Sequence, residues 1–181
     1  MSARSLVALV TLTVVCLAAG CSSSSTSGTG TDPNTTTAPA LLSVVPLGGA
    51  TNVSRTGPMM MQFDEAMGMG MEQYIDLHHG TIVDATRPMS CTWSVDRKTV
   101  TCTPNTPMDP QAQYVLHMGG GMKGADSMMA NMANATQMGG QAVTTGGMGS
   151  MHAGQSMSMM GTGWKASDGS YGTMFPFRTG N

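Results

Sequence analysis

Apolar and polar residues alternate over several short stretches of the chain, most clearly over 90–104. The apolar positions that share one face there are Cys91, Trp93 and Val95 on the first arm, and Val100 and Cys102 on the second. This period of two predicts two short strands joined by a tight turn at Asp96-Arg97. The two arms therefore form a β-hairpin with one apolar face.

The register of this hairpin brings two cysteines together. A two-residue turn places Trp93 opposite Val100 and Cys91 opposite Cys102, and a slip of one residue would send the apolar side chains to different faces. Directly opposed residues have Cα atoms about 4.5–5.5 Å apart, which a disulfide can span. We therefore expect a Cys91–Cys102 disulfide, which is typical of an oxidising compartment.

Further strands are expected between turns that are rich in glycine and proline. They are 41–45, 59–63, 112–118 and 172–178, with 74–77 and 81–83 as weaker candidates. Met59, Met61 and Phe63 share one face, while Pro176 lacks an N–H and favours a sheet edge or an outward position. Since no long segment repeats at the 3.6-residue period of a helix, the pattern predicts an all-β fold, a β-sandwich.

Composition narrows the classes of function. The 181 residues carry a formal net charge of -2, only 10% of them are charged, and no basic run is present. This balance gives no electrostatic basis for binding nucleic acid. The sequence also lacks a nucleophile elbow, a phosphate-binding loop, a dinucleotide fingerprint and a zinc-type cysteine pattern.

The N-terminus predicts export. Arg4 precedes an apolar run over 6–17 and small residues over 18–20, so 1–20 is expected to be a signal peptide. Residues 21–40 are rich in serine, threonine and glycine, and we expect them to form a disordered, flexible tether.

Leu17-Ala18-Ala19-Gly20-Cys21 resembles the lipobox of bacterial lipoproteins. The resemblance implies that Cys21 is lipidated and anchors the protein to a membrane of the bacterial cell envelope. The alternative is an ordinary cleaved signal peptide with an incidental cysteine. In a host with an outer membrane, Ser22 after the cysteine resembles the sorting pattern for that membrane.

Several segments in the same order resemble the bacterial immunoglobulin-like domain of the SbsA type. They are 44–46, 49–54, 63–67, 114–116 and 175–179. The resemblance covers 41–126 and 164–180, so the domain is expected over 41–180 with a methionine-rich insert at 127–163. It implies an immunoglobulin-like β-sandwich used for display, spacing or adhesion, and it carries no catalytic residues across, so we expect no enzyme. Two departures are Ala66, in place of the usual proline, and the cysteine pair.

Methionine is the unusual residue of this chain, and eleven of the 21 fall between Met118 and Met160. A core explains Met59 and Met61, because methionine fills irregular gaps. The insert instead surrounds its thioethers with glycine, serine and asparagine. Cu(I) prefers neutral soft ligands of this kind. The candidate ligands are Met128, Met129, Met132, Met148, Met151, His152, Met157, Met159 and Met160.

Three other interpretations of the insert stay open. It could be a passive loop, a sink for oxidants through reversible sulfoxide formation, or an apolar surface for an envelope protein partner. We therefore expect a non-enzymatic binding module for Cu(I), with a structural or adhesive surface module as the alternative. Of the other histidines, His78 and His79 are expected in a solvated turn and His117 on the surface. Asp64-Glu65 is expected to serve as turn or surface chemistry.

Overall fold

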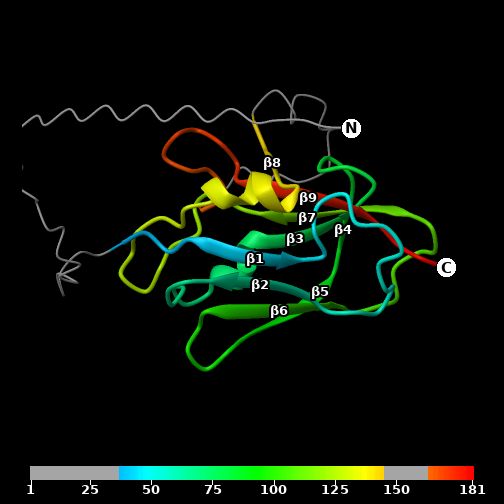
Figure 1. Ribbon diagram of the computed structural model, residues 1–181, viewed down its shortest axis with the longest axis horizontal. Coiled ribbons are helices and arrows are strands. Elements are labelled where there is room, and N and C mark those ends of the chain that lie inside the picture. Colours follow the sequence, from blue (N-terminus) through cyan, green and yellow to red (C-terminus); the bar gives the residue numbers. More distant parts are fainter. Residues whose placement is uncertain (1–36, 145–162) are drawn as a thin grey trace, which may run out of the picture. The chain divides into compact units, whose positions relative to one another are not determined.

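A computed structural model describes residues 37–144 and 163–181, which form two antiparallel β-sheets (Figure 1). One sheet has the order β1-β2-β6-β5 and contains β1 (Leu41–Val45), β2 (Met59–Phe63), β5 (Met89–Trp93) and β6 (Thr99–Pro104). The other has the order β4-β3-β7-β9-β8 and contains β3 (Ile75–His79), β4 (Thr86–Arg87), β7 (Gln113–Met118), β8 (Gln141–Ala142) and β9 (Thr173–Arg178). Two short 3₁₀ helices are η1 (Met71–Tyr74) and η2 (Ala133–Met138). The all-β fold class is confirmed.

The core lies between the two sheets and follows the predicted alternation. On β2, Met59, Met61 and Phe63 are buried while the residues between them are exposed. Leu116 of β7 and Phe175 of β9 are fully buried in the same core. Because successive side chains of a strand point to opposite faces, each of these strands turns one set of apolar residues inward.

The stapled hairpin has the predicted register. Cys91 pairs with Cys102, Trp93 pairs with Val100, and the two cysteines form a disulfide. The expectation for Val95 is wrong, because this side chain is fully exposed. The ladder ends at Ser94, whose N–H donates to the carbonyl of Thr99 at 2.8 Å, so Val95 already lies in the turn.

The five-stranded sheet is covered on both faces. Its inner face contributes to the main core, and its outer face carries a second buried cluster formed by Ile82, Val115, Val143, Trp164 and Tyr171. We call this second cluster the outer core. Tyr114 to Met118 of β7 are consequently all buried, and the strand has no solvent side over these residues.

This outer core overturns three sequence-based expectations. His117 is fully buried rather than exposed, because Trp164 and Tyr171 cover its face of the sheet. His78 is also fully buried and lies in β3, so the pair with His79 is not a solvated turn. Residues 81–83 form no strand; they are part of a turn after β3, and the short strand that follows is β4.

Residues 127–144 are built into the sandwich, contrary to the expectation that the insert 127–163 stands outside the fold. β8 pairs with β9, and η2 packs against β1. The N–H of Gly48 donates to the carbonyl of Met138 at 2.8 Å, which fixes the end of η2. Residues 145–162 lie outside the described part of the chain.

The sandwich begins within the segment predicted as a tether. The carbonyl of Pro39 accepts the N–H of Asn131 at 2.6 Å, and the N–H of Ala40 donates to the carboxylate of Asp64 at 2.7 Å. The carboxylate of Asp64 thus contacts backbone, as turn or surface chemistry would. Within residues 37–144 and 163–181, no helix has the length and apolarity needed to cross a membrane.

Candidate functional site

The first methionines of the insert lie on a segment that folds back on the chain before it. The N–H of Gly124 donates to the carbonyl of Met128 at 2.8 Å, and the N–H of Ala130 donates to the carbonyl of Met122 at 2.8 Å. These bonds connect the backbone of 122–124 to that of 128–130. They leave Met128 41% exposed and Met129 half-buried.

The next residues are tied to the start of β1. Asn131 donates its N–H to Pro39, accepts the N–H of Leu41 at 3.2 Å, and accepts the N–H of Ala133 on its side-chain oxygen at 2.9 Å. Met132 is therefore held in place, half-buried and packed against the main core. This contact gives at least one insert methionine the apolar partner that the sequence did not reveal.

A turn before β9 forms the opposite wall. The N–H of Ala166 donates to the carbonyl of Ser170 at 2.7 Å, and the N–H of Ser170 donates to the carboxylate of Asp168 at 2.8 Å. These hydrogen bonds from the backbone and then the side chain of Ser170 hold the pKa of Asp168 below its ordinary value of 3.8. The carboxylate is thus ionised at neutral pH, since lowering the pKa favours the charged form.

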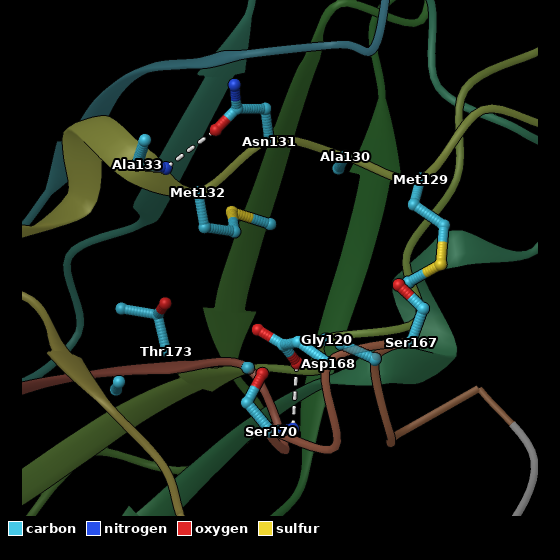
Figure 2. Close-up of a pocket in the computed structure, with 13 residues that line it drawn as sticks. Gly120, Met129, Ala130, Asn131, Met132, Ala133, Ser167, Asp168, Ser170 and Thr173 are labelled. Carbon is cyan, nitrogen blue, oxygen red and sulfur yellow. Dashed lines mark hydrogen bonds between the residues drawn. The ribbon is translucent and has the colours of Figure 1, made fainter.

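Between these two walls lies a cavity of about 380 Å³, which Figure 2 shows in close-up. One wall is 129–133 of the insert, the other is the turn with Ser167, Asp168 and Ser170, and Thr173 of β9 lies at the base. The Met132 side chain is directed into the space between the walls in Figure 2. We call this cavity the methionine pocket.

The donor groups of the methionine pocket suit one kind of ion. Met129 and Met132 offer neutral thioethers, which are soft ligands, and Asp168 offers a single negative charge. One carboxylate balances a monovalent soft cation better than a divalent one. Met129 and Met132 are therefore the residues of this pocket that could serve as soft ligands, and two thioethers alone do not complete the coordination of such an ion.

The remaining predicted ligands cannot be placed. Those outside the described residues are Met148, Met151, His152, Met157, Met159 and Met160, together with the predicted lipidation site Cys21. Within the described ranges, no group of three histidine, cysteine, aspartate or glutamate side chains is arranged to hold a metal ion. Of the nine predicted ligands, Met129 and Met132 line the same pocket, where Figure 2 shows Met129 beside Ser167 and apart from Met132, while Met128 is exposed.

The second methionine group, at 67–71, serves the fold. Met67 is fully buried, and the thioether of Met71 accepts the N–H of Lys123 at 3.2 Å. Met69 is 82% exposed, but the guanidinium of Arg97 donates to its sulfur at 2.7 Å. A cation already occupies the one exposed thioether, so this group is a poor metal site.

Sequence reasoning missed the most unusual polar residues of the molecule, which are His78 and His117 in the outer core. Their ring centres lie 6.0 Å apart, and the ring of His117 stacks on Trp164 with 5.1 Å between centres. Burial lowers the pKa of His117 from 6.5 to about 4. The one signal in the sequence was the position of His117 within an otherwise apolar strand.

Comparison with known proteins identifies the fold family. A family model described as a bacterial Ig-like domain matches residues 35–144. The matched range includes 127–144, in agreement with the built-in position of these residues. A search of curated proteins finds no significant match.

The solved structures that resemble part of this chain include L,D-transpeptidases and a bacterial S-layer protein. L,D-transpeptidase 1 of Mycobacterium tuberculosis shares 16% identity with a TM-score of 0.36, over 59% of this chain and 42% of that chain. An L,D-transpeptidase of Mycobacterium smegmatis shares 18% identity with a TM-score of 0.36, over 59% of this chain and 42% of that chain. The N-terminal part of the bacterial S-layer protein SbsC shares 12% identity with a TM-score of 0.39, over 54% of this chain and 22% of that chain. In each case the match spans less than half of the neighbour's length.

Proposed function

This chain belongs to the bacterial Ig-like domain family, and from that premise we propose that it is a non-enzymatic module of the cell envelope that binds Cu(I) through its methionine-rich insert. The family and the two-sheet fold support the general part of the proposal, a structural or surface module. The copper-binding part is supported by the ligand chemistry of the insert.

One observation carries the copper proposal: Met129 and Met132 line the same open pocket as Asp168, whose carboxylate is ionised. Thioethers bind Cu(I) well and, unlike free thiols, are not lost to disulfides in an oxidising compartment. The Cys91–Cys102 disulfide fits a protein of such a compartment. The six candidate ligands between 148 and 160 would complete the coordination.

The test is a titration of the purified protein with Cu(I), without oxygen, against a chelator that competes for the ion. We expect the triple variant Met128→Leu, Met129→Leu and Met132→Leu to raise the Kd for Cu(I) by about tenfold or more. Leucine keeps the volume of methionine but removes the sulfur. Deleting 127–163 would be a poor test, because that deletion removes η2 and β8.

A matched control for the methionine-to-leucine changes lies in the four-stranded sheet. Met60 of β2 is 42% exposed, almost the same as Met128, and Met60→Leu should leave the Kd unchanged. A second variant replaces the six ligand candidates between 148 and 160 and tests the outer part of the insert. Wild-type affinity in both insert variants would overturn the proposal.

The anchor is a separate part of the proposal. The lipobox at 17–21 would place acyl chains on Cys21, and several chains hold a protein at a membrane durably. Mass spectrometry of the mature N-terminus should find the acyl groups on Cys21, and Cys21→Ser should abolish them. An unmodified mature N-terminus would remove the anchor from the proposal.

A second candidate function is adhesion to another envelope protein, and a strip of exposed apolar side chains supports it. Val45 of β1 and Met60 of β2 are directly opposed and 52% and 42% exposed, and Leu42 and Leu47 nearby are 51% and 53% exposed. Side-chain strips of this kind favour contact with a partner. A photo-cross-linker at residue 45 should then capture one envelope protein whether or not copper is chelated, and no specific cross-link would refute this candidate.

A further inference from the structure

Two imidazoles share the outer core, where polar side chains are rare. His78 of β3 and His117 of β7 are both fully buried, and the side chains that enclose them include Ile82, Val115 and Trp164. A buried polar group without a hydrogen bond costs free energy, so each ring nitrogen should have a partner.

Each ring has one nitrogen that is satisfied and one that is not. His117 Nε2 lies 2.7 Å from the carbonyl oxygen of Tyr171, and His78 Nδ1 lies 3.0 Å from that of Asp84. A carbonyl can only accept, so these nitrogens carry the protons and donate. The other nitrogens, His78 Nε2 and His117 Nδ1, then present lone pairs, and neither has a partner in the described part of the chain.

A third soft donor lies on the same face. Met174 of β9 pairs directly with His117, and directly opposed residues project to the same side of a sheet. Met174 is half-buried and packs against the outer core. The two imidazoles and the Met174 side chain therefore lie on the same face of the sheet.

We propose that His78, His117 and Met174 form a binding site for one monovalent soft cation, Cu(I) or Ag(I), in the outer core. The ring centres lie 6.0 Å apart, a separation that one ion bonded to both rings could span, since a metal–imidazole bond is about 2.0 Å long. Imidazole and thioether are both ligands that suit copper.

The charge of the surroundings selects a monovalent ion. Moving an ion into an apolar interior is costly, and the cost rises with the square of its charge. Asp76 pairs with His117 in the register, so its carboxylate lies on the same face as the two imidazoles and can balance positive charge there. Burial keeps the His117 imidazole neutral at neutral pH, so its lone pair is available without loss of a proton.

This site shares its ion with the proposed function but none of its residues, so either proposal can fail alone. The test uses the full protein with histidine labelled by ¹⁵N and Ag(I) in excess over both proposed sites, because Ag(I) does not change its oxidation state. We expect the resonances of His78 Nε2 and His117 Nδ1 to shift, while those of His79 stay in place. Unshifted resonances for His78 and His117 would overturn the proposal and leave the pair a structural role.

Variants give a second measurement. Met174→Leu conserves volume and should weaken Ag(I) binding at this site by about tenfold or more, and His78→Leu should abolish the His117 shift. His79→Gln, on the neighbouring residue of β3, is the matched control and should bind as the wild type does. The leucine variants of Met129 and Met132 should leave the histidine shifts intact, and loss of the shifts in those variants would contradict a separate site.

Discussion

At the scale of single residues, the hydroxyl of Tyr114 joins three segments at one end of the sandwich. The Tyr114 side chain is fully buried, and its oxygen accepts the N–H of Asp109 at 2.9 Å and an N–H of Arg87 at 3.2 Å. The same hydroxyl donates to the Asp109 carboxylate at 3.3 Å, and Arg87 also donates to that carboxylate. The loop that carries Asp109 is thereby attached to β4 and β7.

This arrangement predicts an acid dependence of stability. Hydrogen bonding from Arg87 lowers the pKa of Asp109 below 3.8, so the unfolded state binds more protons at acidic pH. The contribution of Asp109 to stability is therefore present above pH 3.8 and lost as the pH falls through the lowered pKa of the folded state. Asp109→Asn should make the fall in urea midpoint below about pH 4 less steep. Arg87→Met should have the same effect, because it removes the cause, and an unchanged slope in both variants would contradict the assignment.

At the scale of elements, the disulfide hairpin β5–β6 is fully specified by local sequence. The disulfide closes a short loop, with a sequence separation of 11, and should contribute about 2–3 kcal/mol. Replacing Cys91 and Cys102 by alanine should lower the free energy of unfolding by that amount, measured by urea denaturation. Adding reductant should destabilise the wild type but not the variant. Thiols that react freely in protein isolated without reductant would show that the pairing is wrong.

The 3₁₀ helix η2 provides a test of the insert as part of the fold. Gly139 ends η2 with φ of 75°, and a Cβ there would overlap the backbone of Gly48. Gly49 has a similar φ of 82°, but a Cβ there would meet no atom within 4 Å. Gly139→Ala should therefore destabilise the protein by about 1–3 kcal/mol more than Gly49→Ala, since both incur the cost of positive φ and only one adds a clash. Equal losses would mean that the end of η2 does not pack against the turn at Gly48.

The sequence predicts an element well where one face of a strand is buried and the other is wet. β2 and the hairpin arms have such alternation, and the bounds of β2 and the register of the hairpin were correct. The turn was not, because it is longer than the predicted two residues and includes Val95. The alternation rule fails for β7, because both faces of this strand are buried. His117 occupies an alternate position at which a strand with one solvent face would expose its side chain. The residues that cover it, near 164 and 171, follow about 50 positions later, so no local pattern contains this information. β8 and η2 are likewise short and are stabilised by distant partners.

The candidate site was predictable in composition but not in structure. The high local density of methionine identified Met129 and Met132 as candidate ligands. The glycine and asparagine around them, however, suggested a loop without apolar contacts. Asn131 explains the difference, because two of its hydrogen bonds, to Pro39 and Leu41, tie the segment to the start of β1 next to Met132, which packs on the core. Asp168 contributes from a segment more than thirty residues away, which no motif connects to the insert.

At the scale of the whole molecule, the described residues form three layers rather than two. The two sheets enclose the main core, and the segment that contains Trp164 and Tyr171 adds a third layer over the outer face of the second sheet (Figure 1). The outer core, with its buried imidazoles, exists because of this third layer. Its stability can be tested through the largest side chain in it.

Trp164 is 5% exposed, stacks on His117 and meets Tyr74 edge-on, with 5.7 Å between the ring centres. Trp164→Ala should reduce the free energy of unfolding by about 3–5 kcal/mol, because it removes a buried aromatic and leaves a cavity. Trp164→Phe retains an aromatic ring and should recover part of the loss. Urea denaturation measures both variants, and binding of a fluorescent hydrophobic dye should increase only for the alanine variant. A loss within about 0.5 kcal/mol, as for an ordinary surface substitution, would mean that the third layer does not cover the sheet, and the buried histidines would then be open to solvent.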